Sequence, residues 1–440
     1  MTLVPRLVRS ALAIRRHPTA SRAELKAFQD AQLRRLVVHA YESVPYYRKL
    51  FDRARLHPRH IRGTVDLDLI PISSKTDYQN RAAAELITRG VDPGELLSVH
   101  TNGSTGEPLL VRRTWWEQGF NMMFRERCWR AFGLGLGERR ATVGQRRRPD
   151  PKDKKILGRA LQAIGAHPTL RLDGMQPPEE IARQLAAFQP QMLVAIPGML
   201  CLVADYVIST GRQDIRPRIL VTGGEVLTPL MRQRLQKAFG VEPLQTYASH
   251  EVPLMGWECR QTGEMHTCDD GAIVEVLRDG RPTAPGEDGE VVVTNLHAYA
   301  MPFIRYRLAD VATRGDQQCG CGEPFSTVRA IQGRMIDYFP LPDGRLVHPY
   351  EILRRIPRVD EWIRQYHLLQ DRADRIVMQV VPSHGSSPEL QQLISDAVAP
   401  LIGPGIEFQV RMVDVIPAGP GGKRRHSCSL VASAYEGIRS

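Results

Sequence analysis

Short apolar runs alternate with a helical pattern in the middle of the chain, and this alternation constrains the fold more than any other feature. Residues 192–196 and 218–221 are apolar runs that end near proline or glycine, as buried strands do. Residues 199–208, between them, carry a helical pattern. Strands that alternate with helices form parallel sheets covered by helices. We therefore predict an α/β fold with a largely parallel sheet.

The pattern changes twice along the chain. Residues 272–294 contain strands separated by turns, which predicts a smaller antiparallel barrel or sheet. After Arg334, alternating apolar positions at 376–380 and 406–412 flank a helix that Pro388 begins and that runs through Ala399. A chain of 440 residues exceeds what one core usually fills. We predict an N-terminal domain at 1–334 and a small α+β domain at 335–440.

Ser21 and Glu24 form a capping box, which predicts the start of a helix. The stretch before it, residues 1–16, is basic and partly apolar but lacks a clean apolar core and a cleavage site. An amphipathic surface helix is the favoured interpretation, ahead of a mitochondrial-type presequence, and a secretory signal is not expected.

The net charge of +11 raises the question of an acidic partner. The basic residues are spread along the whole chain, and only residues 145–155 make a dense run, which prolines interrupt. We therefore expect no nucleic-acid partner. No run of about 18 apolar residues exists, so no membrane span is expected either. Seven cysteines, an odd and sparse number, indicate reduced thiols in a cytoplasmic protein.

Residues 99–108 form a polar, glycine-rich loop between two apolar runs. Backbone N–H groups and hydroxyls in such a loop can surround phosphate oxygens, although no Walker lysine follows. A plain hairpin turn remains an alternative. Far downstream, Lys423 is the only lysine after Lys237 and follows a glycine pair. A lysine in this position suits a phosphate or a developing oxyanion.

Six motifs occur in an order that resembles the adenylate-forming superfamily of acyl-CoA ligases. They are Thr101–Pro108 (Thr-Asn-Gly-Ser-Thr-Gly-Glu-Pro), Thr222–Glu225 (Thr-Gly-Gly-Glu), Tyr247–Glu251 (Tyr-Ala-Ser-His-Glu), Ile304–Asp310 (Ile-Arg-Tyr-Arg-Leu-Ala-Asp), Ile331–Arg334 (Ile-Gln-Gly-Arg) and Lys423. The resemblance implies a large N-terminal adenylate-forming domain, with a parallel-sheet part and a small β subdomain, and a small mobile C-terminal domain.

The resemblance also implies a binding site for ATP. The matched nucleotide-binding residues are Thr101, Gly103, Ser104, Thr105, Gly106, Gly223, Gly224, Glu225, Tyr247, Asp310 and Arg334. The loop from Thr101 would hold the β- and γ-phosphates, and Tyr247 would lie near the adenine. Asp310 would accept hydrogen bonds from ribose hydroxyls, and Arg334 would contact the ribose or the α-phosphate.

Two further matched residues carry the chemistry that the resemblance implies. Glu251 would hold Mg²⁺, since a hard cation beside phosphates prefers a carboxylate. Lys423 would bridge the substrate carboxylate and the α-phosphate as charge develops at phosphorus.

Within the superfamily, phenylacetate–coenzyme A ligases and their capsule-biosynthesis relatives are the most similar. Residues 39–47, residues 300–307 and the Cys-x-Cys-Gly segment are similar to those proteins. The chain departs from the family at Glu107, where relatives often have lysine. It also departs after Arg334, where Met335 and Ile336 precede Asp337 in place of an acidic hinge pair. The loop at 341–347 resembles the capsule-type relatives, which leaves the acceptor of the acyl group open.

Cys259, His266, Cys319 and Cys321 form a second constellation. One imidazole and three thiolates close a tetrahedral Zn²⁺ site with no open position, which is the pattern of a structural zinc. Cys268 is an alternative to His266, and unrelated reduced cysteines are the alternative to a metal site.

These observations predict an AMP-forming acid–CoA ligase-like enzyme that uses ATP, Mg²⁺ and coenzyme A. Its substrate would be a small carboxylic acid, with an aromatic acid favoured. Transfer of the acyl group to an amine or another nitrogen nucleophile is the first alternative. A non-catalytic, zinc-stabilised binding module is the second. Whether the protein forms a homodimer stays open.

Overall fold

The computed structural model describes residues 12–101, 109–144, 168–225, 227, 229–316, 318–331, 339–347, 349–357, 362–382, 388–416 and 427–431. These residues form two compact units, the first ending with Ile331 and the second beginning with Phe339. Within these ranges, no helix combines the length and the apolar character that crossing a bilayer requires.

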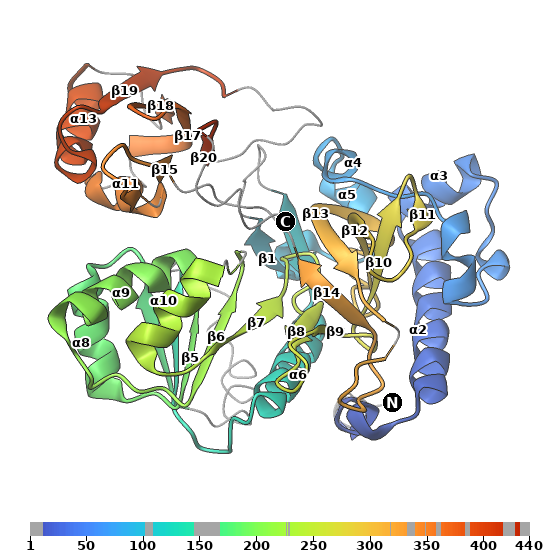
Figure 1. Ribbon diagram of the computed structural model, residues 1–440. Helices are drawn as coiled ribbons and strands as arrows, with labels where there is room; N and C mark the ends of the chain where they lie inside the picture. The colour runs from blue at the N-terminus through green and yellow to red at the C-terminus, as the bar shows by residue number, and fades with distance from the viewer. Residues whose placement is uncertain are drawn as a thin grey trace. The chain divides into compact units, whose positions relative to one another are not determined.

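The first unit contains helices on both sides of a long sheet (Figure 1). Its described helices are α2 (Arg22–Ser43), α3 (Pro45–Arg53), α4 (Lys75–Gln79), α5 (Ala83–Leu86), α6 (Trp115–Ala131), α8 (Pro178–Phe188), α9 (Pro197–Thr210) and α10 (Pro229–Phe239). Short 3₁₀ turns lie at η1 (His17–Thr19), η2 (Pro58–His60), η3 (Thr64–Leu69) and η4 (Pro93–Glu95).

The described strands of this unit are two to nine residues long. They are β1 (Leu97–His100), β2 (Leu110–Arg113), β3 (Arg140–Gly144), β4 (Thr169–Asp173), β5 (Met192–Ala195), β6 (Ile219–Gly223), β7 (Pro243–Tyr247), β8 (Gly256–Glu258), β9 (Met265–Thr267), β10 (Ala272–Arg278), β11 (Arg281–Pro282), β12 (Asp288–Asn295), β13 (Tyr306–Arg314) and β14 (Thr327–Ile331).

One twelve-stranded sheet joins the parallel and the antiparallel parts, in the order β11-β10-β12-β13-β14-β9-β8-β7-β6-β5-β3-β4. Every pair from β4 to β7 is parallel, and every pair from β7 to β11 is antiparallel. The predicted α/β class is confirmed. The antiparallel strands continue the parallel sheet at β7 and do not form a separate sheet, because β8 pairs with the edge that β7 leaves open.

The local predictions in this unit agree with the structure. The predicted strands at 192–196 and 218–221 are β5 and β6, and the helix between them is α9. The capping box at Ser21 and Glu24 is formed and begins α2. The α2 side chains Leu33 and Leu36 are buried in one core with Val291 and Val293 of β12. The N-terminal helices therefore pack against the antiparallel part of the sheet.

The second unit is a small α+β fold. Its elements are β15 (Phe339–Pro340), β16 (Leu346–Val347), α11 (Pro349–Arg355), β17 (Ile363–Arg372), β18 (Arg375–Pro382), α13 (Pro388–Ile402), β19 (Glu407–Met412) and β20 (Ser427–Ser429). Four strands pair in the order β19-β18-β17-β20, and α13 connects the parallel neighbours β18 and β19. Helix α13 buries Leu390, Ile394 and Val398 on one face. It runs three residues beyond the predicted end at Ala399.

Candidate functional site

The parallel strands β6 and β7 end side by side, at the edge where ligands bind in open α/β sheets. Gly223 of β6 pairs with Thr246 of β7. A Cβ at Gly223 would lie 2.6 Å from Oγ1 of Thr246, so only glycine allows this close approach. Gly224 follows with a φ of +87°, in the left-handed region that favours glycine. The backbone geometry thus favours glycine at both positions, whether or not a ligand binds there.

Glu225 completes the turn, and its carboxylate reaches the start of α9. Its Oε2 accepts a hydrogen bond from the backbone N–H of Gly198 at 3.1 Å. A carboxylate at a helix N-terminus is stabilised by the unpaired N–H groups there. Glu225, a candidate nucleotide-binding residue, therefore also links the start of α9 to the end of β6.

Tyr247 and Asp310, two candidate nucleotide-binding residues, are in contact although they lie 63 positions apart in the sequence. The hydroxyl of Tyr247, at the end of β7, donates to Oδ2 of Asp310 in β13 at 2.8 Å. The parallel and the antiparallel parts of the sheet each contribute one residue to this pair. The structure thus brings the predicted adenine-side tyrosine to the predicted ribose-side carboxylate.

Glu251 follows β7 in a loop whose backbone is held on three sides. Asn295 donates its side-chain N–H to the carbonyl of Glu251 at 2.8 Å, and Arg113 donates to the carbonyl of His250 at 2.6 Å. Ser249 and Val252 exchange two hydrogen bonds across the loop. These contacts leave little freedom in the backbone that carries Glu251.

The Glu251 carboxylate itself is buried, with 9% of the residue exposed. Its Oε1 accepts a hydrogen bond from the hydroxyl of Tyr306 at 3.3 Å. Within the part of the chain that the structure describes, no lysine, arginine or histidine forms an ion pair with it. A carboxylate that meets a neutral donor and no protein cation suits Mg²⁺, a hard cation that binds through oxygen ligands.

The base of the glycine-rich loop is closed by a pair of hydrogen bonds. Thr101 donates its N–H to the carbonyl of Leu109, and the Thr101 hydroxyl accepts from the N–H of Leu109, each at 2.9 Å. Strands β1 and β2 on either side pair as an antiparallel hairpin. The glycine-rich segment therefore connects the two strands of a hairpin, and this arrangement is compatible with a role in phosphate binding.

Several predicted residues lie outside the described residues. They are Gly103, Ser104, Thr105, Gly106, Glu107, Arg334, Met335, Ile336, Asp337 and Lys423.

The candidate zinc ligands come together from three segments of the antiparallel part of the sheet. Cys259 follows β8, His266 lies in β9, and Cys319 and Cys321 lie between β13 and β14. Their ligand atoms all lie within 4.8 Å of one another. Two sulfurs bound to one tetrahedral Zn²⁺ lie about 3.8 Å apart, so the cluster fits the size of such a site.

The chemistry of the four side chains also suits a metal. Burial lowers the pKa of His266 to about 4, which keeps its imidazole neutral and able to act as a ligand. Burial acts against ionisation of Cys259, but hydrogen bonds from Thr262 and neighbouring backbone N–H groups lower the pKa of that thiol. Cys268, the alternative ligand, points elsewhere. It accepts a hydrogen bond from Arg127 at 3.2 Å and lies 3.6 Å from Asp270.

Asp270 is the centre of a buried ion cluster that the motifs gave no reason to expect. Its carboxylate accepts two hydrogen bonds from Arg127, in α6, and lies 2.6 Å from Nδ1 of His17. Its backbone carbonyl lies 2.8 Å from Nε2 of His297. Although burial opposes ionisation, Arg127 and His17 hold the pKa of Asp270 well below its usual range. This cluster ties η1 and α6 to the strand region next to the zinc ligands.

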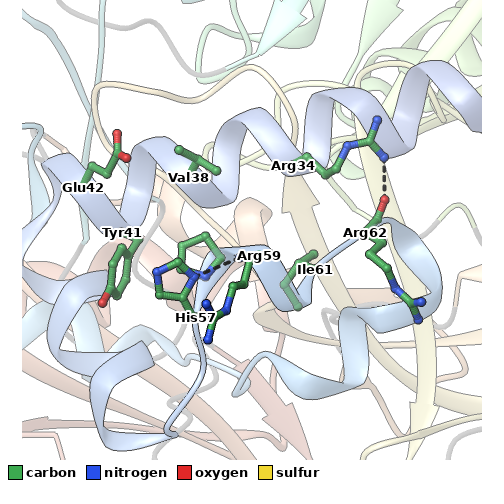
Figure 2. Close-up of a pocket in the computed structure, with 9 residues that line it drawn as sticks. Arg34, Val38, Tyr41, Glu42, His57, Arg59, Ile61 and Arg62 are labelled. Carbon is green, nitrogen blue, oxygen red and sulfur yellow. Dashed lines mark hydrogen bonds between the residues drawn. The ribbon is translucent and has the colours of Figure 1, made fainter.

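A concavity of about 550 Å³ lies on the surface of α2 and η2 (Figure 2). Arg34, Val38 and Tyr41 of α2 face His57 and Arg59 across it, and Arg34 donates a hydrogen bond to the carbonyl of Arg62. None of the candidate site residues lines this concavity. It is therefore not the candidate active site.

Tyr306 and Asn295 are the contacts to Glu251 that sequence reasoning missed. Tyr306 lies inside the Arg-Tyr-Arg segment that was matched to the superfamily, and a tyrosine at that place in a motif is a signal that could have been followed. Asn295 ends a strand without any motif around it. Its contact depends on the pairing of β12 with its neighbours, which no local pattern encodes.

Comparison with known proteins identifies relatives of this chain. Residues 340–428 match the family described as CapK C-terminal domain. The chain is 31% identical to phenylacetate–coenzyme A ligase of Escherichia coli, over 80% of this chain and 81% of that protein. It is 26% identical to phenylacetate–coenzyme A ligase of Thermus thermophilus, over 86% of both.

A solved structure of 2-hydroxyisobutyryl-CoA ligase, in complex with 2-HIB-AMP and CoA, has a similar fold. The TM-score is 0.67 at 18% identity, over 96% of this chain and 93% of that chain. Because the likeness to the Escherichia coli enzyme covers four fifths of both sequences at 31% identity, the chain belongs to the phenylacetate–coenzyme A ligase family, as residues 39–47, residues 300–307 and the Cys-x-Cys-Gly segment indicated.

Proposed function

We propose that this protein activates an aromatic carboxylic acid with ATP and transfers the acyl group to coenzyme A. In the first step a carboxylate oxygen attacks the α-phosphorus, the bond between the α-phosphorus and the bridging oxygen breaks, and pyrophosphate leaves. In the second step the thiolate of coenzyme A attacks the acyl carbon, and AMP leaves. One observation carries the proposal: the buried Glu251 carboxylate meets a neutral donor and no cation among the described residues, near the carboxyl ends of β6 and β7.

Residues of the first unit bind ATP in this proposal. Asp310 accepts hydrogen bonds from the ribose, while the Tyr247 hydroxyl orients that carboxylate. Glu251 would hold Mg²⁺, and that ion would supply positive charge beside the phosphates. The loop that begins at Thr101 holds the β- and γ-phosphates, with Gly103, Ser104, Thr105 and Gly106 as its members.

Two basic residues outside the described residues complete the proposed site. Arg334 contacts the ribose or the α-phosphate, and Lys423 reaches the α-phosphate from the second unit during adenylation. We propose 1–334 and 335–440 as the two domains. In this scheme the second domain moves between the steps and withdraws Lys423 before coenzyme A reacts.

The aromatic acid is proposed on two grounds. Two relatives, which are 31% and 26% identical to this chain, carry the name phenylacetate–coenzyme A ligase. In addition, Ile196 lies beside Gly144 and Gly224, which carry no side chains. A Cβ built on either glycine would lie 3.9 Å from the Ile196 side chain. An apolar side chain at the carboxyl edge of the sheet suits contact with a flat ring.

Zinc has a structural role in this proposal. Cys259, His266, Cys319 and Cys321 would hold one Zn²⁺ and join the turn after β8 to the segment between β13 and β14. A site closed by four protein ligands has no open position for a substrate.

The proposal is tested by ATP–pyrophosphate exchange with a panel of aromatic, amino and fatty acids. We expect exchange with an aromatic or arylacetic acid and formation of its thioester once coenzyme A is added. A clear preference for fatty or α-amino acids would remove the aromatic acid and leave the adenylation step standing. Turnover only after addition of an amine would replace coenzyme A as the acceptor. Absence of exchange with every acid would contradict the proposal.

Lys423→Ala separates the two half-reactions. Exchange should fall by about 10²–10⁴-fold, because one charge partner of the transition state is lost. Thioester formation from a supplied acyl adenylate should be retained, since Lys423 acts only in the first step. Equal losses in both assays would contradict movement of the second domain between the steps.

A further inference from the structure

Tyr306 lies at the beginning of β13, four residues before Asp310, and its hydroxyl faces the catalytic candidate Glu251. The residue is 2% exposed, and the hydroxyl donates to Oε1 of Glu251 at 3.3 Å. A phenol donates a hydrogen bond without carrying a charge. It can therefore orient the carboxylate while the negative charge remains for a cation.

The backbone of Tyr306 is held by Ser73, which precedes α4. Ser73 donates its N–H to the carbonyl of Arg305 at 2.9 Å, and its carbonyl accepts from the N–H of Arg307 at 2.8 Å. This pair of bonds joins the residues on both sides of Tyr306 to a segment far earlier in the chain. Tyr306 can then move along β13 only if the bridge to Ser73 breaks.

The ring of Tyr306 is held by two aromatic neighbours. Tyr78 of α4 meets it edge-on, with ring centroids 5.3 Å apart and planes at 90°. Phe303 meets it at 5.2 Å and 80°. Both arrangements are the edge-to-face geometry that aromatic pairs prefer. The direction of the Tyr306 hydroxyl is thus set by packing.

Tyr47 of α3 holds the segment that leads into Tyr306. Its hydroxyl accepts from the N–H of Ile304 at 2.8 Å and lies 2.5 Å from the Tyr78 hydroxyl, which lies 3.0 Å from the carbonyl of Pro302. The Tyr47 hydroxyl also lies 3.2 Å from the carbonyl of Pro302, so one of the two hydroxyls donates to the other and the other donates to Pro302. Burial raises the pKa of both tyrosines, so both hydroxyls stay protonated at neutral pH and these hydrogen bonds persist.

Arg305, directly before Tyr306, has a φ of +45°, which is rare for a residue other than glycine. Its guanidinium forms an ion pair with Glu275 at 3.0 Å and donates to the carbonyl of Ile70 at 2.8 Å. A strained backbone persists only where its surroundings hold it, and such residues gather at functional sites. The turn at Arg305 leads the chain into β13, where Tyr306 meets Glu251.

We propose that Tyr306 is a positioning residue that directs the Glu251 carboxylate toward the Mg²⁺ of bound ATP, and that Ser73, Tyr47 and Tyr78 hold Tyr306 for this task. The inference rests on the proposed function, in which Glu251 binds that cation. It also assigns a role to the N-terminal segment 39–47, whose Tyr47 supports the active site from α3.

The test is Tyr306→Phe, which keeps the ring and removes only the hydroxyl. The probe is Mn²⁺ together with α,β-methylene-ATP, which cannot release pyrophosphate. The Kd of Mn²⁺ is measured by electron paramagnetic resonance on the full chain without acid. We expect the Kd to rise about 10-fold, as for loss of an outer-shell partner of a metal ligand. In exchange assays the half-saturating Mg²⁺ concentration should rise likewise, while the KM of the acid stays unchanged.

Tyr41→Phe is the matched control. It removes a tyrosine hydroxyl that bonds Asp52 on the surface of α2 and α3, and it should leave the Kd of Mn²⁺ unchanged. An unchanged Kd in Tyr306→Phe would overturn the inference, as would a rise that appears equally in Tyr41→Phe.

Glu251→Gln separates failure of this inference from failure of the proposed function. Loss of Mn²⁺ affinity in Glu251→Gln with none in Tyr306→Phe would retain Glu251 as the metal ligand and reject Tyr306. Unchanged affinity in both variants would reject the metal role of Glu251 and the inference with it.

Discussion

Asp270 and Glu251 are both buried carboxylates of the first unit, but their surroundings differ in kind. Asp270 is 0% exposed, accepts two hydrogen bonds from Arg127 and contacts His17. Glu251 is 9% exposed and meets the neutral hydroxyl of Tyr306. The charge of Asp270 is neutralised within the protein. The charge of Glu251 is oriented but not neutralised by any described residue.

This difference separates a carboxylate that holds the fold from one that is available for chemistry. Arg127 is itself enclosed by aromatic rings, with its guanidinium carbon 5.2 Å from the Trp257 ring centroid and 4.9 Å from that of Phe325. Removing the Asp270 charge would leave the Arg127 guanidinium without its counter-ion in an apolar environment. Removing the Glu251 charge leaves no described cation without a counter-ion. The two sites should therefore respond in opposite ways to the same chemical change.

The largest effect on stability is expected from Asp270→Asn. It should lower the free energy of unfolding by about 3–5 kcal/mol, because one partner of a buried ion pair is lost. Urea denaturation followed by circular dichroism measures this. The double variant with Arg127→Met should recover part of the loss, since it leaves no unpaired charge. Equal stability of Asp270→Asn and the unmodified protein would refute the structural role.

The same cluster predicts a dependence of stability on pH. The pKa of Asp270 is lower in the folded protein than in the unfolded chain. Its contribution is therefore complete above about pH 4, the ordinary value for an aspartate, and is lost as the pH falls toward the folded pKa. Asp270→Asn should remove this part of the acid sensitivity, which urea midpoints measured from about pH 2 to about pH 7 would record.

Glu251→Gln is the reverse case. We expect pyrophosphate exchange to fall about 10²-fold, which corresponds to about 2.7 kcal/mol. The free energy of unfolding should stay the same or rise slightly, because a buried charge becomes neutral with the same shape. If Glu251→Gln instead destabilised the protein while exchange survived, Glu251 would be a structural carboxylate like Asp270 and the comparison would fail.

The zinc cluster supplies a third case, in which charge is neutralised by a metal. Purified protein should contain about one equivalent of Zn²⁺. Cys319→Ser should lower the free energy of unfolding by about 2 kcal/mol, within the usual range for one substitution, and change the KM of ATP much less. Cys428→Ser, which alters a thiol outside the cluster, is the control. Metal-free protein that melts at the same temperature would refute the zinc site.

Local patterns predicted much of the secondary structure. The proline at the start of α13, the capping box of α2 and the apolar runs of β5 and β6 all act over a few residues, and each element formed, with α13 extending three residues beyond its predicted end. The joining of both sheet parts into twelve strands was not predicted. It depends on β8 pairing with β7 and on β9 pairing with β14, and strand pairing is set by the whole fold.

The sequence by itself determined the superfamily, because six motifs in a fixed order identify it without any coordinates, and residues 39–47, residues 300–307 and the Cys-x-Cys-Gly segment indicated the family within it. It also determined four zinc-ligand candidates whose residue types suit the metal. Only the tertiary structure decided what surrounds each carboxylate. Asp270 meets Arg127 across 143 positions, and Glu251 meets Tyr306 across 55. Both acids lie in loops that follow strands, and although a motif marks Glu251, it does not specify which side chains surround either acid. The folded chain alone places a cation beside one and a neutral phenol beside the other, and the neighbours of a buried charge govern what it can do.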